Sequence, residues 1–131
     1  MEDAAITTEI TVLEWSVILL LVHIVIQTLW LVKDRGLGYA LSARDTAEPV
    51  SAVCDRLTRG LRNFVETYGA FIALALALAV TGKTGGWGAL IWFWARVVYI
   101  PVFMAGIPGL RTAVWTVSII GLVMMLVQLM A

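Results

Sequence analysis

Four long apolar stretches alternate with polar segments along the chain. They cover residues 15–32, 64–81, 87–106 and 112–131. A helix needs about 20 apolar residues to cross the hydrocarbon core of a bilayer. The alternation over about 10 residues that marks a membrane β-barrel strand does not occur in these stretches. The pattern therefore predicts an all-α integral membrane protein, a four-helix bundle that forms a single membrane domain over residues 1–131.

Composition excludes a water-soluble protein. Hydrophobic residues make up 61% of the 131-residue chain and charged residues only 14%, whereas soluble domains contain about 25% charged residues. A soluble domain of this size cannot bury so much apolar surface. The single cysteine also excludes a disulfide framework and a cysteine-based zinc site. Membrane lipids are therefore the first expected partners, and we expect neither nucleic acid nor a metal.

Basic residues are distributed unequally between the connecting segments. The predicted loop 33–63 carries six of the nine Lys and Arg residues, and the first 14 residues carry none. Basic loops stay in the cytoplasm. We therefore expect loop 33–63 to be cytoplasmic and both termini of this multi-pass protein to lie outside.

Two charged residues lie inside the predicted spans. Glu66 lies one turn inside the second span, and Arg96 lies near the middle of the third. Charge inside a bilayer is unfavourable and marks a candidate functional residue. A Glu66–Arg96 ion pair would offset both penalties, and this structural role is compatible with ligand binding by either residue.

Polar residues recur at helical spacing where the second span begins. Arg59, Arg62, Asn63 and Glu66 occupy positions i, i+3, i+4 and i+7, which places them on one helical face. Snorkelling at the cytoplasmic interface explains Arg59. It does not explain why the polar face continues inward to Asn63 and Glu66.

The third span repeats this spacing near the same side of the membrane. Arg96, Tyr99 and Phe103 lie at i, i+3 and i+7, and Arg111 follows a short turn. Together with the polar face of the second span, they would line a cytoplasmic cavity. Guanidinium groups suit carboxylates, and a carboxylate and an amide suit an ammonium and a peptide backbone. A small anionic peptide-like ligand fits this set better than a metal or a nucleotide.

These motifs resemble those of the MAPEG family, the membrane-associated proteins in eicosanoid and glutathione metabolism. The run R-x-x-R-N-x-x-E at 59–66 resembles the family's second-helix signature. The run A-R-V-V-Y-I-P-V-F at 95–103, with Gly106 and Arg111 after it, is similar to the third-to-fourth helix region of short bacterial members. The resemblance covers essentially the whole chain.

The resemblance implies a homotrimer with glutathione, a co-substrate, bound between subunits on the cytoplasmic side. Arg111 and Thr112 would favour the glutathione thiolate, because a nearby cation lowers the pKa of a thiol from about 8.5. The thiolate would attack a small lipophilic electrophile, as in a transferase or peroxidase of a bacterial inner membrane. The implied glutathione-binding residues are Arg59, Arg62, Asn63, Glu66, Arg96 and Tyr99.

Two alternatives stay open. Phe103 stands where members often carry a second tyrosine, which favours a non-catalytic relative that binds a lipid or a partner protein. Glu14 at the start of the first span resembles the membrane glutamate of small four-helix exporters, although those have short loops. Glutathione-dependent conjugation distinguishes the first alternative, and proton-coupled transport distinguishes the second.

Overall fold

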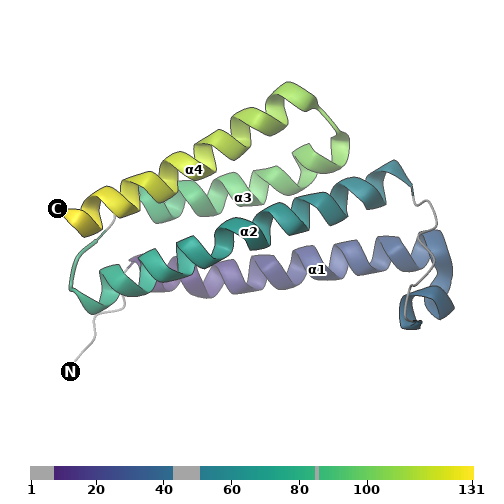
Figure 1. The fold of residues 1–131 in the computed structure, drawn as a ribbon, viewed down its shortest axis with the longest axis horizontal. Coiled ribbons are helices and arrows are strands. Elements are labelled where there is room, and N and C mark those ends of the chain that lie inside the picture. The colour runs from purple at the N-terminus through teal and green to yellow at the C-terminus, as the bar shows by residue number, and fades with distance from the viewer. Residues whose placement is uncertain (1–7, 43–50, 85) are drawn as a thin grey trace.

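The structure is a bundle of long helices (Figure 1). This computed structural model describes residues 8–42, 51–84 and 86–131, and these contain no strand. The prediction of an all-α fold with four apolar helices is therefore confirmed. The helices are α1 (Thr8–Leu41), α2 (Ala52–Val80), α3 (Gly88–Ala105) and α4 (Pro108–Met130).

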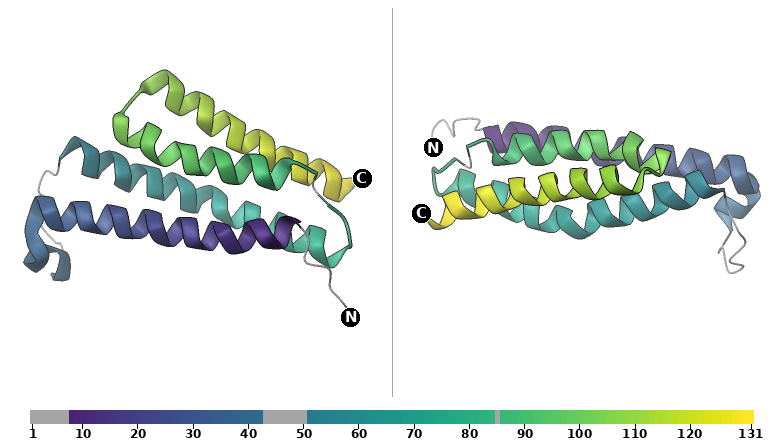
Figure 2. Two further views of the ribbon diagram at one scale, coloured as in Figure 1. Left: turned by 180° about the vertical axis from the view of Figure 1, so that it is seen from behind. Right: turned by 90° about the horizontal axis from the view of Figure 1, so that it is seen from above.

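The helices α2 and α3 lie between α1 and α4. Each of the two inner helices contacts all the others, whereas α1 and α4 share no close backbone contact among the described residues. Figures 1 and 2 show the start of α1 and the end of α4 at the same end of the bundle, as an even number of crossings requires. The start of α2 and the turn between α3 and α4 lie at the other end.

The outside of the bundle is apolar. All four helices are long and apolar enough to cross a membrane, and large side chains such as Leu21, Leu29 and Val123 are exposed. Water would oppose this arrangement, but lipid chains are as apolar as these side chains. The chain is therefore a multi-pass integral membrane protein.

The helices extend beyond the predicted spans into the segment 33–63. The helix α1 reaches Leu41 after a kink at Gly36, whose φ of 85° is not helical, and α2 already begins at Ala52. Ser51 caps α2 by accepting a hydrogen bond from the backbone of Cys54, and it donates one to Asp34 at 2.6 Å. Parts of the predicted loop are therefore helical, because hydropathy detects only the part of a helix that lies in lipid.

Aromatic rings fill the core between α2 and α3. Phe71 stacks on Trp92 with centroids 3.9 Å apart, and Phe64 meets the same indole edge-on at 5.7 Å. Tyr68 also stacks on Trp92, and its hydroxyl hydrogen-bonds to Ser16 of α1 at 2.8 Å. These contacts fix α2 against α1 and α3.

Two glycines bring α3 and α4 into backbone contact. A methyl group placed on Gly88 would lie 2.7 Å from the backbone oxygen of Gly121. A methyl group on Gly121 would lie 2.7 Å from the oxygen of Gly88 and 2.8 Å from the backbone nitrogen of Trp92. Small residues permit such close helix packing in membranes. This contact fixes the register between α3 and α4. It therefore also determines which side chains of the two helices lie close together near the turn that joins them.

Candidate functional site

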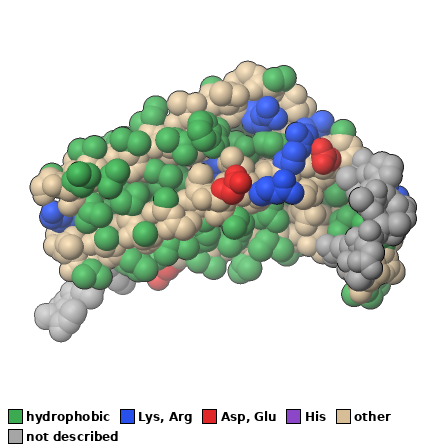
Figure 3. Space-filling view, viewed as in Figure 1, with side chains coloured by type: hydrophobic (Ala, Val, Ile, Leu, Met, Phe, Trp, Pro, Cys, Tyr) green, Lys and Arg blue, Asp and Glu red, His purple; other side chains and the backbone are tan. Residues whose placement is uncertain are grey.

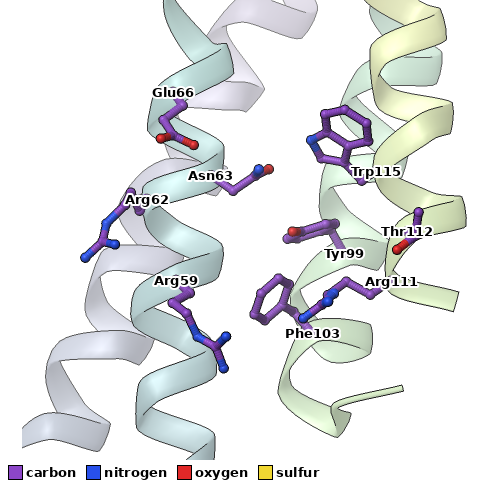
Figure 4. Close-up of a pocket in the computed structure, with 9 residues that line it drawn as sticks. All are labelled: Arg59, Arg62, Asn63, Glu66, Tyr99, Phe103, Arg111, Thr112 and Trp115. Atoms are coloured by element: carbon purple, nitrogen blue, oxygen red, sulfur yellow. The ribbon is translucent and has the colours of Figure 1, made fainter. Parts of the chain in front are cut away.

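A pocket of about 350 Å³ lies between α2, α3 and α4, where α2 begins and α3 ends (Figure 4). In Figure 3, basic side chains gather toward this end of an otherwise mostly apolar face. Seven of the eight predicted site residues line the pocket, although their roles in binding and catalysis stay predictions. The lining residues are Arg59, Arg62, Asn63, Glu66, Tyr99, Phe103, Arg111, Thr112 and Trp115.

The helix α2 supplies the first wall. Arg59, Arg62, Asn63 and Glu66 reach the pocket from successive turns, as their spacing predicted. Figure 4 shows Asn63 extending toward α3 and α4, whereas Arg62 extends the opposite way in this view. Arg62 and Glu66 are both exposed. A ligand entering from the open side of the pocket can therefore reach a cation and a carboxylate on one helix.

The second wall comes from the end of α3 and the start of α4. Gly106, with a φ of 72°, ends α3, and Pro108 begins α4, as is common at such boundaries. The tight turn brings the Arg111 guanidinium over Phe103, 5.1 Å from the ring centre. Phe103 packs against Tyr99 with centroids 5.0 Å apart. An arginine held by an aromatic ring in this way keeps its hydrogen-bond donors for a ligand.

The first turns of α4 add two more lining residues. Thr112 follows Arg111, and its hydroxyl lies 3.4 Å from the backbone oxygen of Pro108. Trp115 also lines the pocket, although it was not among the predicted site residues. The signal was present, because a residue four positions after Arg111 lies on the same helical face.

Arg96 does not line the pocket. Its side chain is fully buried behind the lining residues, and its Nη1 donates a hydrogen bond to Oδ1 of Asn63 at 2.9 Å. The predicted Glu66–Arg96 ion pair is wrong, since Arg96 pairs with Asn63 while Glu66 is exposed at the pocket. The physical reason is the register between α2 and α3, which places the guanidinium one turn before Glu66.

Arg56 holds the turn that leads to Arg111. Its Nε donates a hydrogen bond to the backbone oxygen of Met104 at 3.0 Å. Its guanidinium also lies 3.0 to 3.1 Å from the position that a side chain on Gly106 would occupy. Arg56 therefore covers the end of α3 as well as adding a charge to the membrane surface.

Replacing Arg56 with alanine is expected to lower the free energy of unfolding by about 1–2 kcal/mol, because the Met104 carbonyl loses its charged donor. Arg59→Ala is the matched control on the same helix. Arg59 pairs with the exposed Asp55 at 3.0 Å, and such exposed pairs contribute about 0.3–0.5 kcal/mol. Thermal unfolding in one detergent compares the two variants, and equal losses would contradict the role given to Arg56.

The chemistry of the pocket is that of a site for a small anion that also carries an ammonium group. Three arginines and one carboxylate line it, together with an amide, two hydroxyls and two further aromatic rings. Among the residues that the structure describes, no group of three or more His, Cys, Asp or Glu side chains could hold a metal ion. The donors therefore suit carboxylates and carbonyls, and Glu66 suits a cationic group.

The fold and the pocket together define the class of protein. It is a membrane helix bundle with a basic pocket at one end. Within this class, the chain belongs to the MAPEG family, whose family model matches residues 12–131. The predicted resemblance is confirmed, and membership places the chain among the membrane proteins of glutathione and eicosanoid metabolism in general. No curated protein and no solved structure matches the chain significantly.

Proposed function

We propose that the protein is a glutathione-dependent transferase or peroxidase that acts on small lipophilic electrophiles from the bilayer. The observation that carries this proposal is the pocket itself, where polar groups from three helices converge on about 350 Å³. Glutathione carries two carboxylates, one ammonium group and two peptide groups. The pocket offers donors for the carboxylates and carbonyls, and an acceptor for the ammonium group.

The two walls take different parts of the substrate in this proposal. Arg59, Arg62 and Asn63 of α2 bind the carboxylates and the peptide backbone, while Glu66 binds the ammonium group. Tyr99 of α3 belongs to the second wall, and its hydroxyl binds glutathione. These assignments follow from the charge of each group and from its place in the pocket.

Arg111 and Thr112 act on the glutathione sulfur. The guanidinium stabilises the thiolate, and the Thr112 hydroxyl donates a hydrogen bond to it. With an alkylating electrophile, the thiolate forms the new sulfur–carbon bond while the leaving group departs with its electron pair. Phe103 offers no hydroxyl here. Its ring instead holds the Arg111 guanidinium in place.

The proposed assembly is a homotrimer in a bacterial inner membrane, with the pocket end in the cytoplasm. Family membership supports the trimer, and the gathering of basic residues at the pocket end supports the orientation. A neighbouring subunit would close the open side of the pocket. Cross-linking of the protein in native membranes tests the number of subunits.

Turnover by purified protein tests the proposed activity. Reconstituted protein is mixed with glutathione and either an aryl halide, an enone or a lipid hydroperoxide. We expect conjugation or peroxide reduction that requires glutathione and saturates with it. If the protein binds glutathione but turns over none of the three electrophile classes, a non-catalytic relative that binds a lipid or a partner protein is favoured over a transferase or peroxidase.

Glu66→Gln is expected to weaken glutathione binding about tenfold or more, because a charged hydrogen bond contributes about 1.5–3 kcal/mol. The substitution keeps the size of the side chain and leaves the Arg96–Asn63 hydrogen bond in place. Glu14→Gln removes the same charge from an exposed position on α1 outside the pocket and serves as the control. Titration calorimetry measures both, and an unchanged dissociation constant for Glu66→Gln would remove Glu66 from the site.

A further inference from the structure

Arg96 is a buried charge behind the pocket with an incomplete set of partners. Its side chain is fully buried on α3, and its Nη1 donates a hydrogen bond to Oδ1 of Asn63 at 2.9 Å. Nε and Nη2 are also buried, and neither has a hydrogen-bond partner among the residues that the structure describes. Burying a charge in this way is unfavourable. The arrangement therefore calls for an explanation beyond core packing.

The contact with Arg96 determines which end of the Asn63 amide faces the pocket. A guanidinium group has only donors, so its partner on Asn63 must be the carboxamide oxygen. Amide oxygen and nitrogen are often hard to assign in proteins, but here the chemistry of Arg96 assigns them. Because Asn63 lines the pocket and its oxygen is directed to Arg96, the amide nitrogen is the end left for a ligand.

The same guanidinium also supports a second lining residue. Its central carbon lies 4.3 Å from the centre of the Tyr99 ring and 5.1 Å from that of Phe64. A cation over an aromatic face is attractive, and more so where water is excluded. Arg96 thus contacts one pocket residue from α2 and one from α3 without lining the pocket itself.

We infer that Arg96 is a positioning residue that turns Asn63 into a hydrogen-bond donor toward the pocket, so that the Asn63 position binds only an acceptor group of the ligand, a carboxylate or carbonyl oxygen. The inference rests on the proposed function for the identity of the ligand, glutathione. It divides the polar face of α2 into two parts. Asn63 binds an acceptor, and Glu66, one turn further along, binds a donor.

The chain offers a direct probe of this orientation, because Asn63 is its only asparagine. Isotope-labelled asparagine therefore gives a single side-chain amide in the NMR spectrum of the protein in detergent. We expect this signal to move when glutathione is added. In Arg96→Met, without ligand, we expect it to shift toward the position of a solvent-exposed asparagine. Arg96→Lys, which retains a donor, should restore most of the parent signal. An Asn63 signal that is unchanged in Arg96→Met would overturn the inference.

Asn63→Asp tests the orientation through affinity. Aspartate keeps an oxygen directed at Arg96 and adds an ion pair, so the variant should be at least as stable as the parent. It also replaces the amide nitrogen with an oxygen facing the pocket. We expect its affinity for glutathione to fall about tenfold or more. Parent-like affinity in this folded variant would overturn the inference, whether or not Arg96→Met folds.

The two experiments separate this inference from the proposed function. The ligand-free spectra report the Arg96–Asn63 pairing without glutathione. A parent protein that shows the pairing but does not bind glutathione would contradict the proposed function alone. A parent that binds glutathione while Arg96→Met and Asn63→Asp both bind equally well would contradict the positioning role alone.

Discussion

Arg111→Ala should slow glutathione conjugation by about ten- to a hundredfold at about pH 7, because the thiol of bound glutathione would lose the cation that stabilises its thiolate. The guanidinium lies over the Phe103 ring at the edge of the pocket. Its removal leaves the contacts of α2 in place, so glutathione should still bind. We therefore expect Arg111→Ala to slow the chemical step and to leave the affinity for glutathione almost unchanged.

The difference in rate between the parent and Arg111→Ala should depend on pH. A cation near the sulfur lowers the thiol pKa, so the parent keeps the thiolate at pH values where the variant holds the neutral thiol. The difference in rate should be largest below about pH 7 and shrink above about pH 9, where a free thiol with a pKa of about 8.5 ionises without help. Thiolate absorbance in the ultraviolet follows the same titration. Lys33→Ala, which removes an exposed cation outside the pocket, is the control, and equal profiles for all three proteins would exclude Arg111 as the activating group.

Gly121→Ala should strongly destabilise the bundle. The added methyl group would lie 2.7 Å from the oxygen of Gly88 and 2.8 Å from the nitrogen of Trp92. Both are backbone atoms, so α3 and α4 must move apart. Overpacking of this kind costs about 1–3 kcal/mol and occasionally more. Because this contact sets the pairing of α3 with α4, we also expect weaker glutathione binding.

Gly109→Ala is the matched control for the glycine contact. It adds the same methyl group to α4, where no other described part of the chain, apart from the neighbouring residues and the local helix backbone, lies within 4 Å of it. Thermal unfolding of both variants in the same detergent should show a large fall in the midpoint for Gly121→Ala and almost none for Gly109→Ala. If both variants melt like the parent, the close approach of α3 and α4 does not hold the bundle together.

The sequence predicted what depends on a single helix. Apolar length identified all four helices, and the spacing of Arg59, Arg62, Asn63 and Glu66 identified the face that lines the pocket. Helical periodicity carries this information, because residues three and four apart share a face whatever packs against it. The turn at Gly106 could be predicted in the same way, from glycine and proline at a helix boundary.

The sequence did not predict what depends on how two helices fit together. The sequence predicted Glu66 as the partner of Arg96, whereas the observed partner, Asn63, follows from a register between helices that no local pattern encodes. The contact between Gly88 and Gly121 is of the same kind, since it joins residues from two helices whose sequences show only ordinary glycines. The helical turns of α1 and α2 outside the apolar stretches were not predicted. Hydropathy reports how apolar the side chains of a segment are, and it does not report whether the backbone is helical.

Calorimetric titration of glutathione into the purified protein in detergent tests the central claim most directly, with Arg62→Ala measured alongside. We expect saturable binding by the parent and an affinity about tenfold or more weaker in the variant, since Arg62 lines the pocket and would lose a charged hydrogen bond to the ligand. The absence of binding in a parent protein that unfolds cooperatively would contradict the proposal that the pocket binds glutathione, and the polar face of α2 would then serve another ligand.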